Sequence, residues 1–238
     1  MHLEKRGRFW MSKKVILFIV EGRSDETSLS LILSRLIKSN KVEFYVVGGD
    51  ITSENGTTLQ NCITKVNSCI KKFLKEKKFL KKDILRVIHL VDTDGTYIND
   101  DFVKQSPTNE LIYEEECIWA KDIKFICDRN KRKSSVLNKL YSTPKISGVD
   151  YSMYYFSCNL DHVLHDEQNL NGDLKCDYAD EFVERYYGRE EEFIKFLNES
   201  DFAVDGDYNQ SWKFIKDGLN SLKRNCNLHL LLNEYLTE

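Results

Sequence analysis

The chain has 238 residues, of which 41% are hydrophobic and 31% charged, a balance typical of a globular protein with one large domain or two small ones. Its 35 Lys and Arg residues against 38 Asp and Glu residues give a formal net charge of −3, which excludes attraction of the whole molecule to nucleic acid and leaves only a local basic face. No apolar run reaches the roughly 20 residues of a membrane-spanning helix, and the seven cysteines form no Cys-x-x-Cys pair, so neither a disulfide framework nor a structural zinc site is expected.

The N-terminal half of the sequence alternates strand and helix patterns. Residues 1–10 have neither the apolar core nor the cleavage site of a signal peptide, and Met11 is an alternative start, so we expect a cytoplasmic protein. The expected elements are a strand over 14–20, a helix with Leu29, Leu33 and Leu36 on one stripe, a strand over 42–47, a helix over 58–78 and a strand over 84–91. This alternation predicts a parallel sheet with right-handed crossovers.

The pattern weakens after residue 95. The expected elements there are a strand over 122–127, helices over 133–141 and 160–165, a strand over 153–156, and helices over 178–187, 190–198 and 209–235. We therefore predict an α/β fold, with a catalytic domain over residues 12–170 and a helical extension over residues 171–238 that packs on it.

Acidic side chains follow two of the predicted strands. Glu21 ends the first strand, Asp92 and Asp94 end the third, and Asp25 lies in the first turn of the intervening helix. The carboxyl ends of parallel strands share one rim of the sheet, so these acids are expected to meet there. Packed carboxylates repel one another unless a cation intervenes, and Mg²⁺ prefers oxygen ligands. The sequence therefore predicts a divalent metal site at this rim.

Two groups of residues have simpler interpretations as well. Asp25 suits a first-turn acid that favours the helix dipole, with Ser24 as the N-cap. The basic stretch at residues 129–133 suits a solvated helix face, but it follows a predicted strand, where a parallel sheet binds its ligand. Within that stretch Arg129, Lys131 and Lys133 are the candidate contacts to a nucleic acid backbone.

The strand that ends in Glu21-Gly22-x-x-Asp25, together with the later strand that ends in Asp92-x-Asp94-Gly95, resembles the Toprim domain. That domain is shared by topoisomerases, bacterial primases, ribosomal-RNA maturases and the OLD (overcoming lysogenization defect) nucleases. The resemblance covers residues 14–98, with a weaker match to about residue 170. It implies that Glu21 acts as a general acid/base or metal ligand, and that Asp92 and Asp94 hold Mg²⁺ or Mn²⁺.

The resemblance is closest to OLD-like and phage-defence nucleases, because 71 positions separate Glu21 from Asp92, more than in a compact primase-type domain. Such nucleases often carry a further acid at the start of a helix after a late strand. Asp161 holds that place here, although a glutamate is more usual. The implied activity is metal-dependent hydrolysis of phosphodiester bonds in DNA or RNA, in an antiphage or RNA-processing effector.

Two alternatives stay open at this point. The stretch from His89 to Ile98 also resembles the first motif of haloacid-dehalogenase-type phosphatases, in which Asp92 is the nucleophile and Asp94 the acid/base. The second alternative is a non-catalytic Toprim module that binds nucleic acid or a protein. The sequence contains no Gly-x-x-x-x-Gly-Lys-Ser/Thr, so an ATPase or sensor partner is expected to be a separate chain, and self-association is left open.

Overall fold

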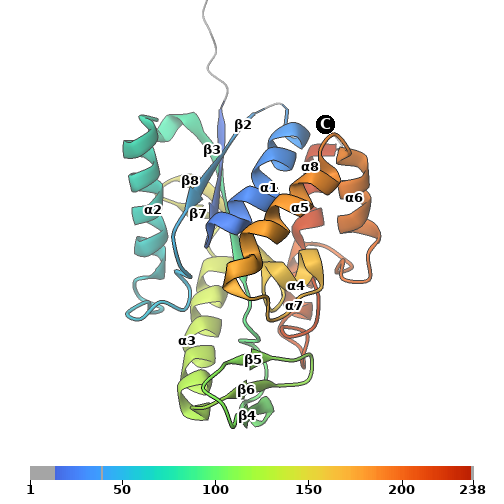
Figure 1. Ribbon diagram of the computed structural model, residues 1–238. Helices are drawn as coiled ribbons and strands as arrows, with labels where there is room; N and C mark the ends of the chain where they lie inside the picture. The colour runs from blue at the N-terminus through green and yellow to red at the C-terminus, as the bar shows by residue number, and fades with distance from the viewer. Residues whose placement is uncertain (1–13, 39, 237–238) are drawn as a thin grey trace, which may run out of the picture.

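The computed structural model describes residues 14–38 and 40–236, and its centre is a five-stranded sheet (Figure 1). The strand order is β2-β1-β3-β8-β7, and all neighbours are parallel except the last pair. The strands are β1 (Val15–Val20), β2 (Lys41–Val46), β3 (Ile84–Asp92), β7 (Lys145–Ile146) and β8 (Val149–Phe156). The prediction of an α/β fold with a mainly parallel sheet is confirmed.

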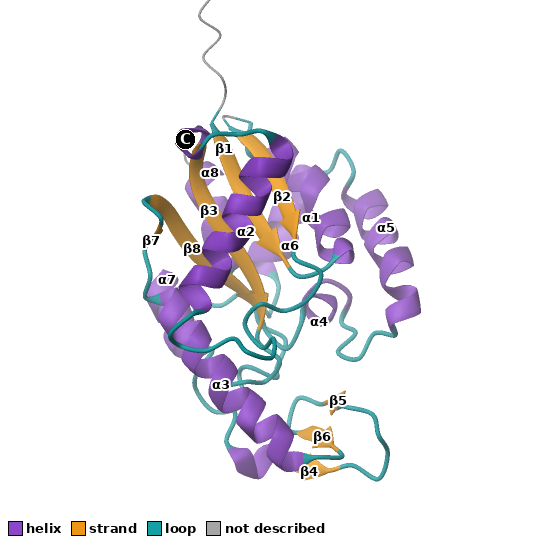
Figure 2. Ribbon diagram, turned by 90° about the vertical axis from the view of Figure 1, so that its left-hand side faces the viewer, coloured by secondary structure: helices purple, strands orange, loops and turns teal. Residues whose placement is uncertain are grey.

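Helices cover both faces of this sheet, as Figure 2 shows. Along β1, Ile16 and Phe18 face one core cluster while Leu17 and Ile19 face the other, so the strand is apolar throughout. The first face carries α1 (Arg23–Leu36), α4 (Leu160–His165), α5 (Lys175–Tyr186), α6 (Glu190–Glu199) and α8 (Leu228–Leu236). The second carries α2 (Cys62–Lys77), α3 (Ile123–Tyr141) and α7 (Tyr208–Phe214). The helices that follow residue 171 therefore pack on both faces.

One predicted strand is wrong. Residues 122–127 begin a single 19-residue helix, α3, which also includes the predicted helix over 133–141. Asp122 is its N-cap, and the Asp122 carboxylate accepts a hydrogen bond from the Phe125 backbone at 2.9 Å. Phe125 is 56% exposed, so the apolar run that suggested a buried strand is only half buried. Burial at a spacing of three to four residues, from Ile126 to Leu140, decides in favour of the helix.

The predicted helix over 209–235 is also wrong, because α7 and α8 are separated by turns. Gly218 there has a positive φ of 53°. Further along, Cys226 bridges to Phe156 at the outer edge of β8, and the Asn225 carbonyl accepts a hydrogen bond from the Ser157 backbone at 2.8 Å. The intervening backbone therefore pairs with the end of the sheet and cannot continue as a helix.

A small second sheet lies between β3 and α3 in sequence and was not predicted. Its strands, in the order β4-β6-β5, are β4 (Val103–Gln105), β5 (Ile112–Tyr113) and β6 (Ile118–Ala120). A third core cluster, which includes Val103, Ile118 and Ile126, packs this sheet against the start of α3. In Figures 1 and 2 it lies beyond the carboxyl ends of the parallel strands, on the side where a ligand is expected.

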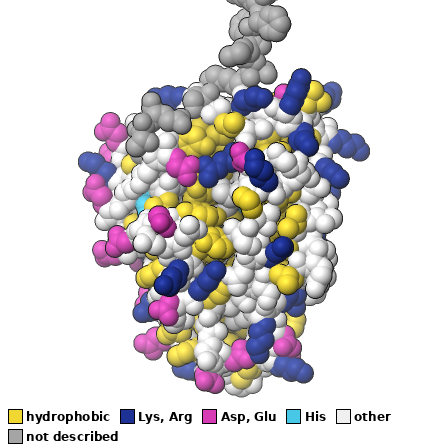
Figure 3. Space-filling model, turned by 180° about the vertical axis from the view of Figure 1, so that it is seen from behind, with side chains coloured by type: hydrophobic (Ala, Val, Ile, Leu, Met, Phe, Trp, Pro, Cys, Tyr) yellow, Lys and Arg dark blue, Asp and Glu magenta, His cyan; other side chains and the backbone are white. Residues whose placement is uncertain are grey.

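The surface carries both charges. On the face seen in Figure 3, Lys and Arg as well as Asp and Glu side chains lie around the margin, and hydrophobic side chains are exposed between them. Within the described residues, no helix has the length and apolar character required to cross a membrane.

Candidate metal and phosphate site

Glu21 and Asp92 lie at the carboxyl ends of β1 and β3, which are neighbours in the sheet. A Glu21 carboxylate oxygen lies 3.5 Å from the Asp92 backbone nitrogen. Burial raises the pKa of Glu21 well above its usual value, and the charges of Asp50 and Asp92 raise it further. Burial likewise raises the pKa of Asp92, with added repulsion from Asp25 and Asp94. The acids predicted to converge do share one rim.

The Asp92–Gly95 turn is held by segments distant in sequence. The Asp92 carboxylate accepts a hydrogen bond from the Leu160 backbone at 2.9 Å, and the Asp94 backbone donates to the Cys158 carbonyl at 2.8 Å. The Ser221 carbonyl accepts from both the Gly95 backbone, at 3.1 Å, and the Thr93 hydroxyl, at 2.8 Å. Asp94 has a positive φ of 49°, so these contacts hold a conformation that few non-glycine residues adopt.

Gly95→Ala is expected to destabilise the fold by about 2–4 kcal/mol. Gly95 has a φ of 64°, and a Cβ added to it would lie 2.5 Å from the Leu222 side chain. Gly56→Ala is the matched control, because Gly56 has a φ of 84° but open space around the added Cβ. Urea denaturation should give the control a smaller loss of about 1–2 kcal/mol. Equal losses would show that the contact with Leu222 contributes nothing.

A buried lysine joins two of the acids. Lys133 is fully buried on α3, and its ammonium lies 2.6 Å from an Asp50 carboxylate oxygen and 2.5 Å from one of Asp94. Burial alone would lower the pKa of Lys133, but Asp50 and Asp94 raise it well above its usual value. For Asp50 the signs are reversed. Burial would raise the pKa of its carboxyl, but the charge and hydrogen bond of Lys133 hold that pKa well below the usual range. The lysine therefore stays charged among the carboxylates.

Asp50 is the site residue that sequence reasoning missed. It follows β2 and the Gly48-Gly49 turn, as Glu21 follows β1 and Asp92 follows β3. The backbone nitrogens of Gly48 and Gly49 both donate to the Glu21 carbonyl, at 2.8 and 3.1 Å, which fixes the turn beside the cluster. The strand-end rule used for Glu21 would have found Asp50 if the rule had been extended past the two glycines.

The remaining predicted metal ligands have other partners. Asp25 accepts from the Gly22 backbone at 2.9 Å, so Gly22 and not Ser24 is the N-cap of α1. Burial raises the pKa of Asp25, partly opposed by that hydrogen bond. Asp161 is buried at the start of α4, and its carboxylate lies 2.6 Å from the Lys175 ammonium.

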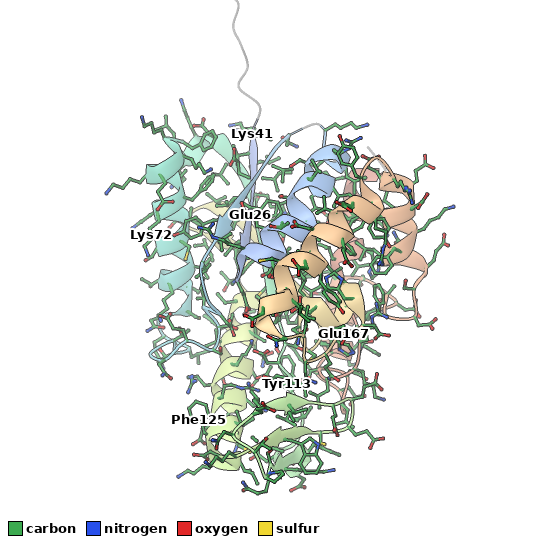
Figure 4. The ribbon with its side chains drawn as sticks, in the orientation of Figure 1. Glu26, Lys41, Lys72, Tyr113, Phe125 and Glu167 are labelled. Carbon is green, nitrogen blue, oxygen red and sulfur yellow. The ribbon has the colours of Figure 1, made fainter. Side chains whose placement is uncertain are left out.

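The three predicted nucleic acid contacts lie within α3 and not after a strand. Arg129 is buried, and its guanidinium donates to the Asp94 carbonyl at 2.9 Å and to the Tyr113 hydroxyl at 2.7 Å. Figure 4 shows Tyr113 on the side of the small sheet that faces the main sheet. Lys131 is exposed and pairs with Asp100. Arg129 and Lys133 therefore brace the acidic turn from inside, and only Lys131 faces solvent.

No group of three or more His, Cys, Asp or Glu side chains within residues 14–38 and 40–236 is arranged to hold a metal ion. Asp94, Asp50 and Asp161 instead bind the two lysines. Glu21 and Asp92 make no ion pair in the described part of the chain, and both resist ionisation because of burial and neighbouring charge. Carboxylate oxygens without an ion-pair partner match a hard divalent cation in donor type.

Comparison of the chain with protein-family models, with curated proteins and with solved structures gives no significant match.

Proposed function

We propose that the chain is a Toprim-type, metal-dependent nuclease that hydrolyses phosphodiester bonds of DNA or RNA. One observation carries this proposal. A Glu21 carboxylate oxygen lies 3.5 Å from the Asp92 backbone, across strand ends 71 positions apart in sequence, and the charges of Asp92 and Asp94 raise the pKa of Glu21. A rim that gathers carboxylates in this way suits a cation and the phosphate that the cation would bind.

The roles of the residues follow from their surroundings. Glu21, Asp92 and the Asp94 oxygen not used by Lys133 would hold Mg²⁺ or Mn²⁺, which supplies Lewis-acid polarisation of the phosphate when bound. The raised pKa of Glu21 brings its protonation closer to neutral pH, where a general acid/base works best. Lys133 and Arg129 fix the position of Asp94, through its carboxylate and its carbonyl.

The cellular setting belongs to the same proposal and is supported only by the resemblance of the Glu21 and Asp92–Asp94 motifs. We propose an antiphage-defence or RNA-processing effector in the cytoplasm, which receives any ATP-driven signal from a separate ATPase or sensor chain.

Incubation with labelled DNA and RNA is expected to give cleavage in Mg²⁺ or Mn²⁺ and none in EDTA. Asp92→Asn should slow this cleavage by at least about a hundredfold, because the substitution removes a charged oxygen donor from the rim. Asp128→Asn is the matched control, since Asp128 lies on the exposed face of α3 away from the cluster. It should cleave at the wild-type rate.

Cleavage that persists in Asp92→Asn, or that does not depend on a divalent metal, would overturn the proposal. Hydrolysis of p-nitrophenyl phosphate, with a phosphoryl group trapped on Asp92, would favour the phosphatase alternative. Nucleic acid binding without any cleavage, unchanged by Asp92→Asn, would favour the non-catalytic alternative.

A further inference from the structure

A groove of about 490 Å³ opens beside Asp50, between the loop that follows β2 and one side of α2. Figure 2 shows the course of this strand and this helix in the fold. Its inner end is formed by Gly48, Gly49 and Asp50, and Asp50 is also a member of the cluster through its bond to Lys133. The groove therefore reaches the acid cluster at Asp50.

The wall on α2 carries the opposite charge to the cluster. Lys65 and Lys72 line the groove from this helix, about one and three helical turns from its first residue, Cys62. The Lys65 ammonium lies 2.6 Å from a Glu54 oxygen, whereas Lys72 is exposed and makes no ion pair among residues 14–38 and 40–236. Figure 4 places Lys72 midway along α2. The same groove is thus lined by Asp50 of the cluster and by the Lys72 ammonium.

Between the acid cluster and the lysines of α2, the groove is formed by glycine backbone without side chains. Gly48 and Gly49 have φ of 80° and 150°, and a Cβ on either would meet no atom within 4 Å. Their nitrogens are engaged by the Glu21 carbonyl, so the turn is held in place while its outer side stays open. Arg132 donates to the Ser53 carbonyl at 3.1 Å and so holds the same loop. Such glycines allow a close approach of a ligand chain.

We infer that this groove holds the backbone of one nucleic acid strand next to the cleaved bond, with Lys72 contacting a phosphate. The inference rests on the proposed nuclease function and names the path of its substrate. A groove of this volume has room for a short stretch of one strand. Positive charge attracts phosphate and repels a metal ion. The lysines of α2 therefore bind the strand, while the acidic rim provides the site of the reaction.

Lys72→Glu, combined with the cleavage-impaired Glu21→Gln, is expected to weaken binding of a labelled single strand of about twelve nucleotides roughly tenfold. The slope of log affinity against log salt should flatten by about 0.7, the value for one lost phosphate contact on a single strand. Lys71→Glu in the same background is the matched control, since Lys71 is the exposed neighbour on α2 that does not line the groove. It should bind like its parent.

In the cleavage-competent protein, Lys72→Glu should raise KM for the strand more than it lowers kcat. Equal weakening by Lys72→Glu and Lys71→Glu, or no weakening by either, would overturn the groove assignment. If the strand is cut but the two variants behave alike, the groove inference fails and the nuclease proposal stands. If nothing is cut while Lys72→Glu alone weakens binding, the nuclease proposal fails and the groove remains a binding site.

Discussion

Glu21→Gln is expected to slow metal-dependent cleavage by about 10²–10⁴-fold and, in the absence of divalent metal, to raise the free energy of unfolding. The glutamine keeps the shape of the side chain but removes a charge that burial and the neighbouring Asp50 and Asp92 make unfavourable. Activity and stability therefore change in opposite directions at one residue. A substitution that only disturbed packing would lower both the cleavage rate and the free energy of unfolding.

The stability gain has a defined pH dependence. The pKa of Glu21 is raised in the folded protein, so the folded state holds a proton that the unfolded state has lost above about pH 4.3. Wild-type stability is thus fully present below that pH and falls as the pH rises through the raised pKa of the folded state. The advantage of Glu21→Gln over wild type should grow across the same window.

Thermal denaturation in EDTA at several pH values measures this difference. Glu76→Gln is a suitable control, because Glu76 is an exposed glutamate on α2 and should follow the wild-type curve. Addition of Mg²⁺ should stabilise the wild type more than Glu21→Gln, since a bound cation compensates the charge that the variant lacks. A constant offset between variant and wild type from pH 4 to 8 would show that the Glu21 charge is not under repulsion.

Lys133→Met is expected to lower the free energy of unfolding in EDTA by about 3–5 kcal/mol. The ammonium of Lys133 is fully buried and lies within hydrogen-bond distance of Asp50 and Asp94. Methionine fills similar space but leaves both carboxylates buried beside Glu21 without a cation. Cleavage should also fall, by about 10–100-fold, because Asp94 loses the group that orients it.

Chemical denaturation with and without Mg²⁺ tests this result. Lys131→Met is the control, because Lys131 is exposed two positions earlier on α3 and its pair with Asp100 is screened by water. The control should unfold close to wild type. Mg²⁺ should recover more stability in Lys133→Met than in wild type, since the freed carboxylates gain a cation. Equal loss in the two variants would contradict a bridging role for Lys133.

The strand ends were predictable from the sequence for a physical reason. Buried parallel strands are continuous apolar runs, so β1 and β3 could be recognised together with the acids that end them, Glu21 and Asp92. Their convergence followed because neighbouring parallel strands finish at one rim. Asp50 escaped notice because β2 is an edge strand with a less apolar sequence and is followed by two glycines.

The environment of Lys133 could not be predicted in the same way. The stretch Arg129–Lys133 has the composition of a solvated helix face. Only the burial of one face along α3 shows that Arg129 and Lys133 face inward while Lys131 faces water. The small sheet escaped prediction because its strands have two or three residues each, which is too short for a period-two pattern. Its contact with the site, through Tyr113, depends entirely on tertiary packing.

The part played by Ser221 has a consequence for how the protein matures. Its carbonyl receives the hydrogen bonds that hold the Asp92–Gly95 turn, although it lies about 130 positions downstream of that turn. A ribosome must therefore synthesise the chain at least as far as Ser221 before the acidic turn takes its final shape. Under the proposed nuclease function, a growing chain surrounded by messenger and ribosomal RNA has no finished active site until Ser221 has been synthesised.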